Sequence, residues 1–533
     1  MTRRQRKLAS SSGDLLHPGA SGPGAESSPR VTERDIMISA RKALHLLDDE
    51  RALRSNPLLA HLDVRLSHDR LRAHVLRALE SLDPGSRADV ASERRGRLYT
   101  ILLQCDVQRI PHERTAATLG LSRRQFYRDR RAALVAFAAA LREVRATAVP
   151  ATTEPRDVRL LYIKTLREQG KYDLVWRESV RALAAMRGDP REAEVWTVAS
   201  EAARFFGNAR KSQEAIDALR AINERPEHPH LRRATALRTA ICEASLDWMQ
   251  ADLSAARARV ERVVCEGGDE RTMYGRDVTL FGILLNLGAR MALDAGDWSA
   301  AAEYTRRGER IAARSEVQHV SSFHHRLRAS LALQRDGDLS RATTELHDAL
   351  DIADAHNAIS PIAISSVELG VALMTSDPGR AIDYIRFGLA MGRDACGFDD
   401  FATLYARTVP ALLAQASTAS VFEGIESLRA RAPLFRRADL MTRLGEASVS
   451  LAAADYAVAA ATTADLAREF ERASMLPAAA EAQVISAEAL CRNGRTLAAR
   501  RALRRAREFI SIHGAAPVRR RAAAIDGTLA LSG

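Results

Sequence analysis

Apolar residues recur every three or four positions along most of this chain, a spacing typical of α-helices with one buried face. Three groups with this spacing lie before residue 110: Ile36, Ala40, Ala43 and Leu47; Leu71, Val75 and Leu79; and Leu98, Ile101, Leu102 and Cys105. They predict a small helical bundle over residues 31–146. We expect residues 1–30 to form a disordered basic tail, because their Ser, Gly and Pro cannot build a core, and residues 147–155 to form a linker.

Beyond the linker, over residues 156–533, the helical pattern repeats. A turn followed by a small residue on a second helix recurs at 170–175, 252–256, 296–301, 337–342, 377–381, 454–459 and 493–499, with weaker copies at 213–215 and 417–420. The small position falls at Val175, Ala215, Ala256, Ala301, Ala342, Ala381, Ser420, Ala459 and Ala499, at intervals of 39 to 45 residues. Nine units with so steady a period predict an α-solenoid of helical hairpins.

The repeated unit resembles a tetratricopeptide repeat. That family has a Gly-Asp/Asn-aromatic turn, an alanine five residues after the glycine, a large apolar residue four further on and a small one three beyond. Two copies meet the pattern in full: Gly337, Ala342, Leu346 and Ala349, and Gly494, Ala499, Leu503 and Ala506. The unit has about 40 residues against the family's usual length of about 34, which longer helices or loops explain. HEAT and armadillo repeats are the alternative, since their periods overlap, but the GDW and GDL turns favour the tetratricopeptide type.

A second pattern lies at residues 111–134, where a short helix, a glycine turn and an arginine-rich helix follow one another in PHERTAATLGLSRRQFYRDRRAAL. Two closely crossing helices need a small residue where they cross. Their turn needs a residue that tolerates positive φ, an apolar plug, an N-cap and an apolar anchor. These five places are filled in order by Ala116, Gly120, Leu121, Ser122 and Phe126. The spacing predicts a helix-turn-helix.

This segment resembles the helix-turn-helix of sigma-factor region 4 and of LuxR-type regulators, in which an LGLS turn precedes the recognition helix. The resemblance implies a bacterial transcription regulator that binds double-stranded DNA. Arg and Gln pair with base edges or phosphates in a major groove. The residues expected to contact DNA are Ser122, Arg123, Arg124, Gln125, Tyr127, Arg128 and Arg131. Where the families carry an apolar residue this chain has Arg130, so we expect Leu134 and Phe137 to take over that packing while the Arg130 stem crosses apolar surface.

Charge is concentrated on the part of the chain that contains this motif. Residues 1–150 hold 27 lysines and arginines against 17 acidic residues, and so carry +10 of the total net charge of +12. A domain that neutralises phosphates needs such an excess, because counterion release drives most non-specific DNA affinity. Residues 151–533 carry only +2, which favours a mixed polar and apolar partner over nucleic acid there.

The length and the rest of the composition indicate the general class of protein. A chain of 533 residues is too long for one core, and its 46% hydrophobic and 27% charged residues are typical of a soluble globular protein. No apolar run approaches the roughly 18 residues of a membrane span, and the N-terminus lacks a signal-peptide core, so we expect a cytoplasmic protein without membrane contact. The five scattered cysteines have no zinc-site spacing, which indicates reduced thiols.

No catalytic motif is present: we find no phosphate-binding loop, GxGxxG, HExxH or GxSxG sequence. We therefore expect no enzyme activity, no cofactor and no metal. The adjacent His324 and His325 point about 100° apart on a helix and lack a paired carboxylate in the sequence, which favours a structural role. We interpret the acidic residues at Asp399, Asp400 and Asp48–Glu50 as solvated loops and helix ends. The tryptophans are expected to fill the core between hairpins, at Trp176, Trp196, Trp248 and Trp298.

Together these patterns predict an all-α protein with an N-terminal helix-turn-helix bundle followed by an α-solenoid of tetratricopeptide-like hairpins. The functional hypothesis is a DNA-binding transcription regulator whose superhelix binds a peptide or protein effector or mediates self-association, with a homodimer as one arrangement. The alternative is a non-catalytic scaffold whose basic N-terminal bundle contacts a protein such as RNA polymerase.

Overall fold

The computed structural model describes residues 33–47, 55–56, 68–82, 90–108, 110–143, 156–168, 171–189, 191–225, 232–266, 276–313, 320–355, 358–414, 418–513 and 515–531. Within these ranges every regular element is a helix and no strand occurs, so the predicted all-α class is confirmed. The expected tail at 1–30, the linker at 147–155 and the acidic run Asp48–Glu50 lie outside the described residues.

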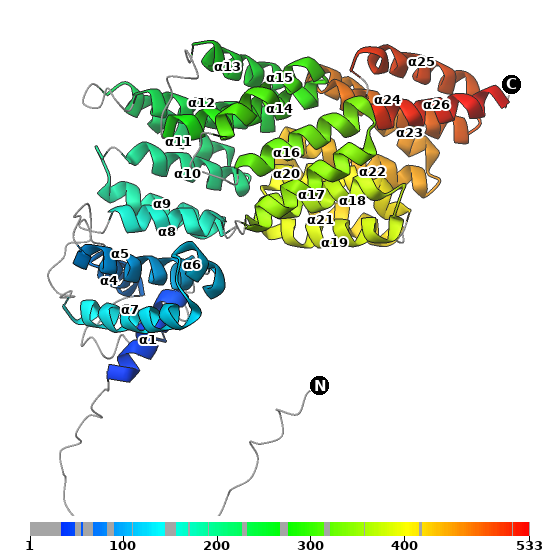
Figure 1. Ribbon diagram of the computed structural model, residues 1–533. Helices are drawn as coiled ribbons and strands as arrows, with labels where there is room; N and C mark the ends of the chain where they lie inside the picture. The colour runs from blue at the N-terminus through cyan, green and yellow to red at the C-terminus, as the bar shows by residue number, and fades with distance from the viewer. Residues whose placement is uncertain are drawn as a thin grey trace, which may run out of the picture.

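The N-terminal part is a bundle built around one long helix, α7. Its elements are α1 (Glu33–His45), α4 (His68–Glu80), α5 (Val90–Leu102), the π-helical turn η1 (Leu103–Val107), α6 (His112–Thr118) and α7 (Arg123–Glu143). Helix α7 packs against α1, α4 and α5, and α6 packs against η1 and the start of α7. Figure 1 shows this bundle beneath the first helices of the repeat region.

The described remainder of the chain is a series of nine antiparallel helix pairs followed by a single helix, α26 (Ala516–Leu531). The pairs are α8–α9 (Arg156–Glu168, Tyr172–Ala185), α10–α11 (Glu192–Phe205, Ala209–Asn223), α12–α13 (Arg232–Met249, Leu253–Glu266), α14–α15 (Arg276–Ala295, Trp298–Ala312), α16–α17 (Val320–Leu331, extended by η4 at Ala332–Asp336, and Leu339–Ala355), α18–α19 (Ile359–Leu373, Pro378–Ala395), α20–α21 (Phe398–Leu413, Thr418–Arg429), α22–α23 (Arg436–Ala452, preceded by η5 at Ala432–Leu434, and Tyr456–Arg472) and α24–α25 (Leu476–Arg492, Thr496–His513).

The predicted small positions all lie on the second helices of these hairpins. Eight of them have an exposed fraction of 0%: Val175, Ala215, Ala256, Ala301, Ala342, Ala381, Ala459 and Ala499. The ninth, Ser420, lies on α21. Small side chains at these places let the two helices of a hairpin approach closely, and Leu346 and Leu503, each at most 2% exposed, fill the space between hairpins.

The repeated turn has a chemical explanation, because its acidic or amide residue caps the second helix. Six such side chains accept a hydrogen bond from the backbone N–H three residues further on: Asn208, Asp252, Asp297, Asp338, Asp377 and Asp455. In five of these turns the residue before the cap has positive φ: Gly207, Ala251, Gly296, Gly337 and Ala454. These caps fix where each second helix begins.

The caps also correct the register of the second hairpin. Ala301 follows its cap, Asp297, by four residues, and the residue in the same place after Asn208 is Ser212, which is 0% exposed. The prediction of Ala215 as the equivalent position was therefore one helical turn too late. The five other capped turns have Asp in this place, and Asn208 is followed by Ala209 instead of an aromatic residue, leucine or proline.

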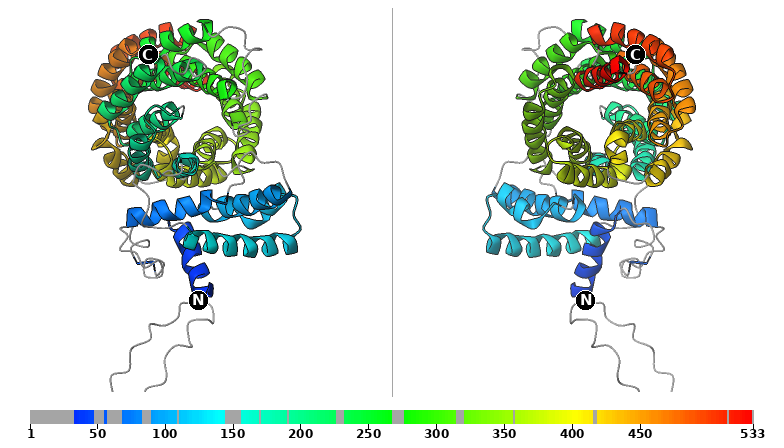
Figure 2. Two further views of the ribbon diagram at one scale, coloured as in Figure 1. Left: turned by 90° about the vertical axis from the view of Figure 1, so that its left-hand side faces the viewer. Right: turned by 90° about the vertical axis from the view of Figure 1, so that its right-hand side faces the viewer.

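The hairpins wind into a superhelix whose successive turns contact each other. Seen along its axis, the helices form a ring (Figure 2). First helices separated by ten helices in the chain pack together, α10 against α20, α12 against α22 and α14 against α24, and α26 packs against η4. First helices of successive turns therefore lie directly against one another, and the superhelix repeats its direction after about five hairpins.

The core is continuous between the N-terminal bundle and the first repeats. One cluster of buried residues includes Leu79 of α4 and Leu141 of α7 together with Ile163 of α8 and Val175 of α9. Helix α4 packs directly on α8. The bundle therefore covers the open end of the first hairpin.

One described helix is long and apolar enough to cross a membrane, the segment Asp277–Ala295 of α14, which the sequence analysis did not single out. Most of this segment, 83% of the apolar window, is buried inside the protein. It also contains Arg290 and Asp294, both in ion pairs. These features fit a core helix of the superhelix.

Candidate functional site

The first candidate site is the surface of α7 that follows the α6–α7 turn. Gly120 adopts φ of +63° with open space around it, and the N–H of Leu121 donates to the carbonyl of Ala116 at 2.9 Å. The hydroxyl of Ser122 accepts a hydrogen bond from the N–H of Gln125 at 3.3 Å, so Ser122 caps α7 as expected. The turn thus has the local geometry that its sequence predicts.

The interior of this helix pair is apolar. Phe126 is 1% exposed and packs in a small cluster with Ile101, Cys105 and Ala116. Leu121 lies at the edge of the same cluster. Ala116 and Phe126 are therefore buried together, and Leu121 lies half-buried beside them.

The outer side of α7 carries most of the expected contact residues. Arg123, Arg124, Tyr127, Arg128 and Arg131 are exposed, and Gln125 is half-buried. Asp129, the one acidic residue among them, is turned inward and is 8% exposed, with Arg97 at 3.8 Å. The result is a basic helix face with no exposed acid between residues 123 and 131.

Arg130 differs from its expected role. It is 8% exposed, and its guanidinium donates to the buried carboxylate of Asp106 in η1 at 2.6 Å. The prediction that its stem simply lies across apolar surface was incomplete, because the partner, Asp106, is 24 residues away in the sequence. Phe137 is fully buried, as expected, while Leu134 is only half-buried.

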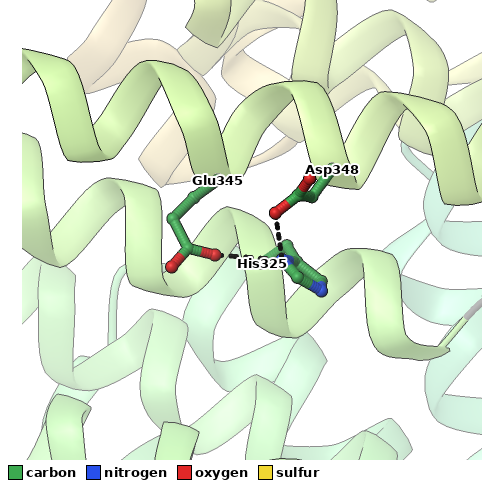
Figure 3. Close-up of side chains that lie close together, drawn as sticks. All are labelled: His325, Glu345 and Asp348. Atoms are coloured by element: carbon green, nitrogen blue, oxygen red, sulfur yellow. Dashed lines mark hydrogen bonds and ion pairs between the residues drawn. The ribbon is translucent and has the colours of Figure 1, made fainter.

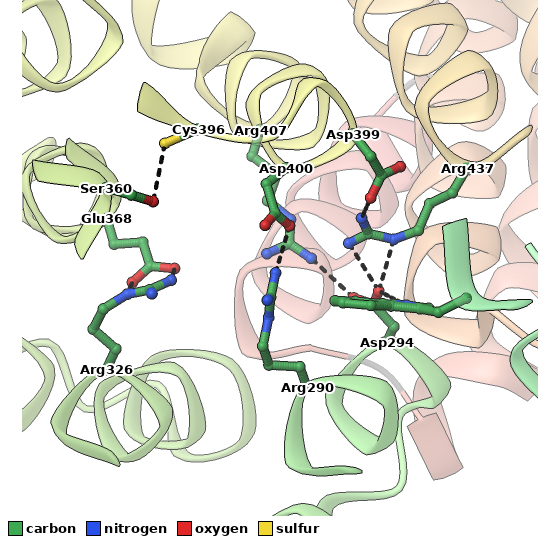
Figure 4. Close-up of polar contacts among 11 residues, drawn as sticks. Arg290, Asp294, Arg326, Ser360, Glu368, Cys396, Asp399, Asp400, Arg407 and Arg437 are labelled. Carbon is green, nitrogen blue, oxygen red and sulfur yellow. Dashed lines mark hydrogen bonds and ion pairs between the residues drawn. The ribbon is translucent and has the colours of Figure 1, made fainter. Parts of the chain in front are cut away.

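The second candidate site is a cluster of charged residues on the first helices of the superhelix (Figure 4). We call this the inner polar cluster and define it as Trp248, Arg290, Asp294, Arg326, Glu368, Asp399, Asp400, Arg407 and Arg437. It joins α12, α14, α16, α18, α20 and α22.

Arg437 lies at the centre of the inner polar cluster. Its guanidinium forms ion pairs with Asp399 and with Asp294, the latter at 3.0 Å, and lies 4.2 Å from the centre of the Trp248 ring. Arg290 lies 4.6 Å from the same ring. The indole N–H of Trp248 donates to Asp294 at 3.0 Å. Trp248 therefore fills the core as predicted, but it also holds two cations in place.

Burial and charge act differently on the two adjacent aspartates. Burial raises the pKa of Asp399 to about 6 in spite of Arg437. Burial opposes ionisation of Asp400 as well, but Arg290 and then Arg437 outweigh it and lower the pKa of Asp400. Both aspartates lie at the start of α20, as expected, and Asp400 is half-buried. The interpretation of Asp399 as a solvated acid was wrong: it is 0% exposed, because α22 from the next hairpin covers it with Arg437.

The histidine pair of α16 divides between core and surface. His324 is 2% exposed and fits against Gly308 of α15; burial lowers its pKa to about 4. His325 faces the other way, and its Nδ1 lies 2.9 Å from Glu345 and 3.7 Å from Asp348, both on α17 (Figure 3). The expectation that no carboxylate accompanies the pair was therefore wrong.

This group of His325, Glu345 and Asp348 has the donor atoms for a metal ion. The guanidinium of Arg328 lies 2.9 Å from the same His325 nitrogen and 2.7 Å from Glu345. A divalent cation would face that positive charge, so we interpret the group as an ion-pair network between α16 and α17.

Comparison with known proteins supports the fold of the repeat region. No protein-family model and no curated protein sequence matches the chain. Among solved structures it is similar to a Rap protein complexed with competence and sporulation factor, with 11% identity and a TM-score of 0.51, over 69% of this chain and 99% of that one. At this identity the likeness shows the fold alone, a tetratricopeptide-like α-solenoid.

Two further solved structures match with scores too low to carry an argument. The apo form of RapI has 11% identity and a TM-score of 0.33, over 64% of this chain and 98% of that one. The APC/C hetero-tetramer Cut9-Hcn1 has 14% identity and a TM-score of 0.39, over 89% and 83%.

Sequence reasoning missed most of the inner polar cluster, including Arg290, Asp294, Arg407 and Arg437. Each of these is an ordinary charged residue on an amphipathic helix, and its partner lies 38 to 143 residues away. A signal was present in the apolar helix at 277–295, where Arg290 and Asp294 are charged residues on an otherwise buried segment.

Proposed function

We propose that this protein is a cytoplasmic DNA-binding transcription regulator whose superhelix binds a peptide or protein effector or self-associates. The observation that carries the proposal is the exposed basic face of α7 directly after a glycine turn with an apolar interior. In a helix-turn-helix, the second helix enters the major groove with its N-terminal residues against base edges. Residues 123 to 131 occupy that part of α7.

The proposal for the superhelix rests on its shape and on its inner face. Solenoids of helical hairpins present extended surfaces on which peptides and proteins bind. The solved Rap protein of similar fold is complexed with competence and sporulation factor. Here the first helices present half-exposed charged groups, such as Arg407 and Asp400, next to apolar side chains.

The contact between bundle and superhelix offers a route for regulation. Because α4 packs on α8 and the two parts share one core, a change in the pitch of the superhelix would move the bundle as well. In a homodimer, such a movement would change the spacing of two DNA-binding surfaces. The proposal requires no catalytic step, cofactor or metal.

The test is recovery of genomic fragments by the purified full-length protein over a salt series. For any fragment retained, we expect the double variant Arg123→Ala/Arg124→Ala to bind more weakly, by roughly 1–3 kcal/mol for each side chain that makes a bidentate base contact. The control is Arg501→Ala/Arg504→Ala, which removes the same charge from exposed positions of α25. The control variant should retain nearly full affinity.

Two results would contradict sequence-specific DNA recognition by α7. Equal losses from both double variants would indicate a diffuse basic surface. Retention of no fragment even at low salt would favour the scaffold alternative, in which the basic bundle contacts a protein such as RNA polymerase. Crosslinks from bound DNA that map mainly beyond residue 155 would overturn the assignment of the two functions to the two parts of the chain.

A further inference from the structure

A polar pocket of about 70 Å³ lies within the inner polar cluster. Its walls come from first helices of six consecutive hairpins, α12 to α22, and from η4. The pocket therefore opens on the inside of the superhelix, where different turns of the chain meet. A cavity of this size accommodates one small polar group rather than a whole ligand.

Two arginines of the pocket use only part of their N–H hydrogen-bond donors. Arg407 has a 45% exposed side chain, and its one described ion pair joins Nη2 to Asp294 Oδ1 at 3.2 Å. Arg290 has a 31% exposed side chain and pairs with Asp400 through Nη2 at 2.5 Å. A guanidinium offers five N–H donors, so each of these two retains donors that can face a ligand.

The other two arginines are more buried, with side chains 12% exposed at Arg326 and 3% at Arg437, and each is held by its neighbours. Arg326 and Glu368 form a two-point pair with distances of 3.0 and 3.1 Å. Arg437 is enclosed by Asp294, Asp399 and Trp248. Arg407 and Arg290 are therefore the cations of the pocket that remain open to a partner.

The potential in the pocket favours an anion. Burial disfavours the charged forms of both Asp294 and Asp400, yet the surrounding arginines, Arg437 foremost for Asp294 and Arg290 for Asp400, lower the pKa values of both carboxyls. Positive charge thus outweighs the cost of burial at two separate points of the wall. The pocket is lined by four arginines against three carboxylates, Asp294, Glu368 and Asp400, which leaves one positive charge for a ligand carboxylate.

The pocket also contains a neutral hydrogen-bond donor, the hydroxyl of Thr403. Thr403 of α20 lines the pocket and is 5% exposed, and its hydroxyl has no hydrogen-bond partner among the described residues. Buried hydroxyls normally have partners, because an unmade hydrogen bond is costly. A ligand oxygen in the pocket would supply the missing acceptor.

We propose that this pocket is a carboxylate-binding subsite, in which Arg407, Arg290 and Thr403 hold an acidic side chain or the C-terminal carboxylate of a peptide bound along the inside of the superhelix. The inference rests on the proposed function, since it requires that the superhelix binds a peptide. Guanidinium and carboxylate groups pair with two parallel hydrogen bonds, which gives such a subsite geometric selectivity.

A ligand bound in the pocket would also change the packing of helices in the superhelix. Arg407 and Arg437 both contact Asp294, so α14 is tied to α20 and α22 at one carboxylate. A ligand carboxylate that draws Arg407 away would loosen one of these ties. The subsite therefore lies where binding can change the packing of helices that are more than 100 residues apart in the sequence.

The experiment uses the immobilised full-length protein and a pool of random synthetic heptapeptides, prepared with free or amidated C-termini. We expect retained peptides to be enriched in Asp or Glu at one position, or in free C-termini. Replacing that carboxylate by an amide should weaken binding about tenfold, the effect of losing a charged hydrogen-bond pair. The variant Arg407→Gln should lose the preference, and Arg407→Lys should keep part of it.

The control variant is Arg306→Gln, which removes an exposed, ion-paired arginine from the second helix α15 and should leave the preference intact. Equal helix content by circular dichroism establishes that Arg407→Gln is folded. Peptides retained without a carboxylate preference, or with one that Arg407→Gln leaves unchanged, would overturn the subsite but not peptide binding. Retention of no peptide by the unchanged protein would overturn both.

Discussion

At the scale of single residues, the buried carboxyl of Asp399 makes the stability of the fold depend on pH. It is fully buried with a pKa raised to about 6, whereas an unfolded aspartate has a pKa of about 3.9. Between these values the folded state binds more protons than the unfolded state, so the contribution of Asp399 to stability is lost as pH rises. We compare the free energy of unfolding of the unchanged protein with that of the variant Asp399→Asn. The difference, unchanged protein minus variant, should fall by about 2 kcal/mol from pH 4 to pH 7.

The neighbouring variant Asp400→Asn is the control for this measurement by urea denaturation. The pKa of Asp400 is lowered, so its contribution is present above the unfolded value and is lost only as pH falls below about 4. Its difference curve should stay nearly flat where that of Asp399→Asn falls. Two flat curves would mean that Asp399 is not destabilised by its surroundings.

At the scale of elements, the turns between paired helices set the stability of each hairpin. Ala454 holds φ of +63° directly before the cap Asp455 of α23, a place where Gly296 and Gly337 stand in other hairpins. The left-handed conformation at positive φ costs an L-residue about 1–2 kcal/mol, and it does not cost glycine this energy. Because Ala454 is exposed, Ala454→Gly should stabilise the protein by about 1 kcal/mol, measured as a rise in the midpoint of urea unfolding.

Ala457, three residues further on and also exposed, is the matched control. It lies inside α23, so Ala457→Gly should destabilise the helix by roughly 0.5–1 kcal/mol. The same substitution is thus expected to have opposite signs on the two sides of one cap. Equal signs would contradict the role of positive φ in the repeat turn.

At the scale of the whole molecule, the bundle and the superhelix are joined by burial and charge. The sequence predicts that residues 156–533 fold alone, since solenoid repeats contact mainly their neighbours. In the structure, Glu178 of α9 is 1% exposed and accepts from Arg72 of α4 at 2.8 Å and from Arg159 of α8 at 3.3 Å. A chain that begins at residue 156 should remain helical by circular dichroism, but its α8–α9 hairpin should lose amide protection.

Hydrogen exchange of both chains measures this effect locally, because the loss of covering groups lowers the free energy of local opening. Hairpins far from the bundle, such as α22–α23, are the internal control and should exchange at the same rate in both chains. Equal protection of α8–α9 with and without residues 1–155 would show that the first hairpin needs no cover.

The sequence by itself determined the elements and their order. Small residues such as Ala301 and Ala342 and caps such as Asp297 act within one hairpin, so their spacing in the chain carries the information directly. The same holds for Gly120, whose positive φ lies in the turn itself, and for Ser122, which accepts from a backbone N–H three residues further on. Local geometry depends on neighbours in sequence, and such features could be predicted.

Only the tertiary structure decided where those elements meet. Asp294 and Arg437 are 143 residues apart, and they pair because the superhelix returns on itself after about five hairpins. That pitch is the sum of small rotations at every helix interface, none of which is visible as a pattern in the chain. Asp399 therefore resembled a solvated helix-end acid in the sequence, and only the packing of α22 over α20 makes it part of a buried polar cluster.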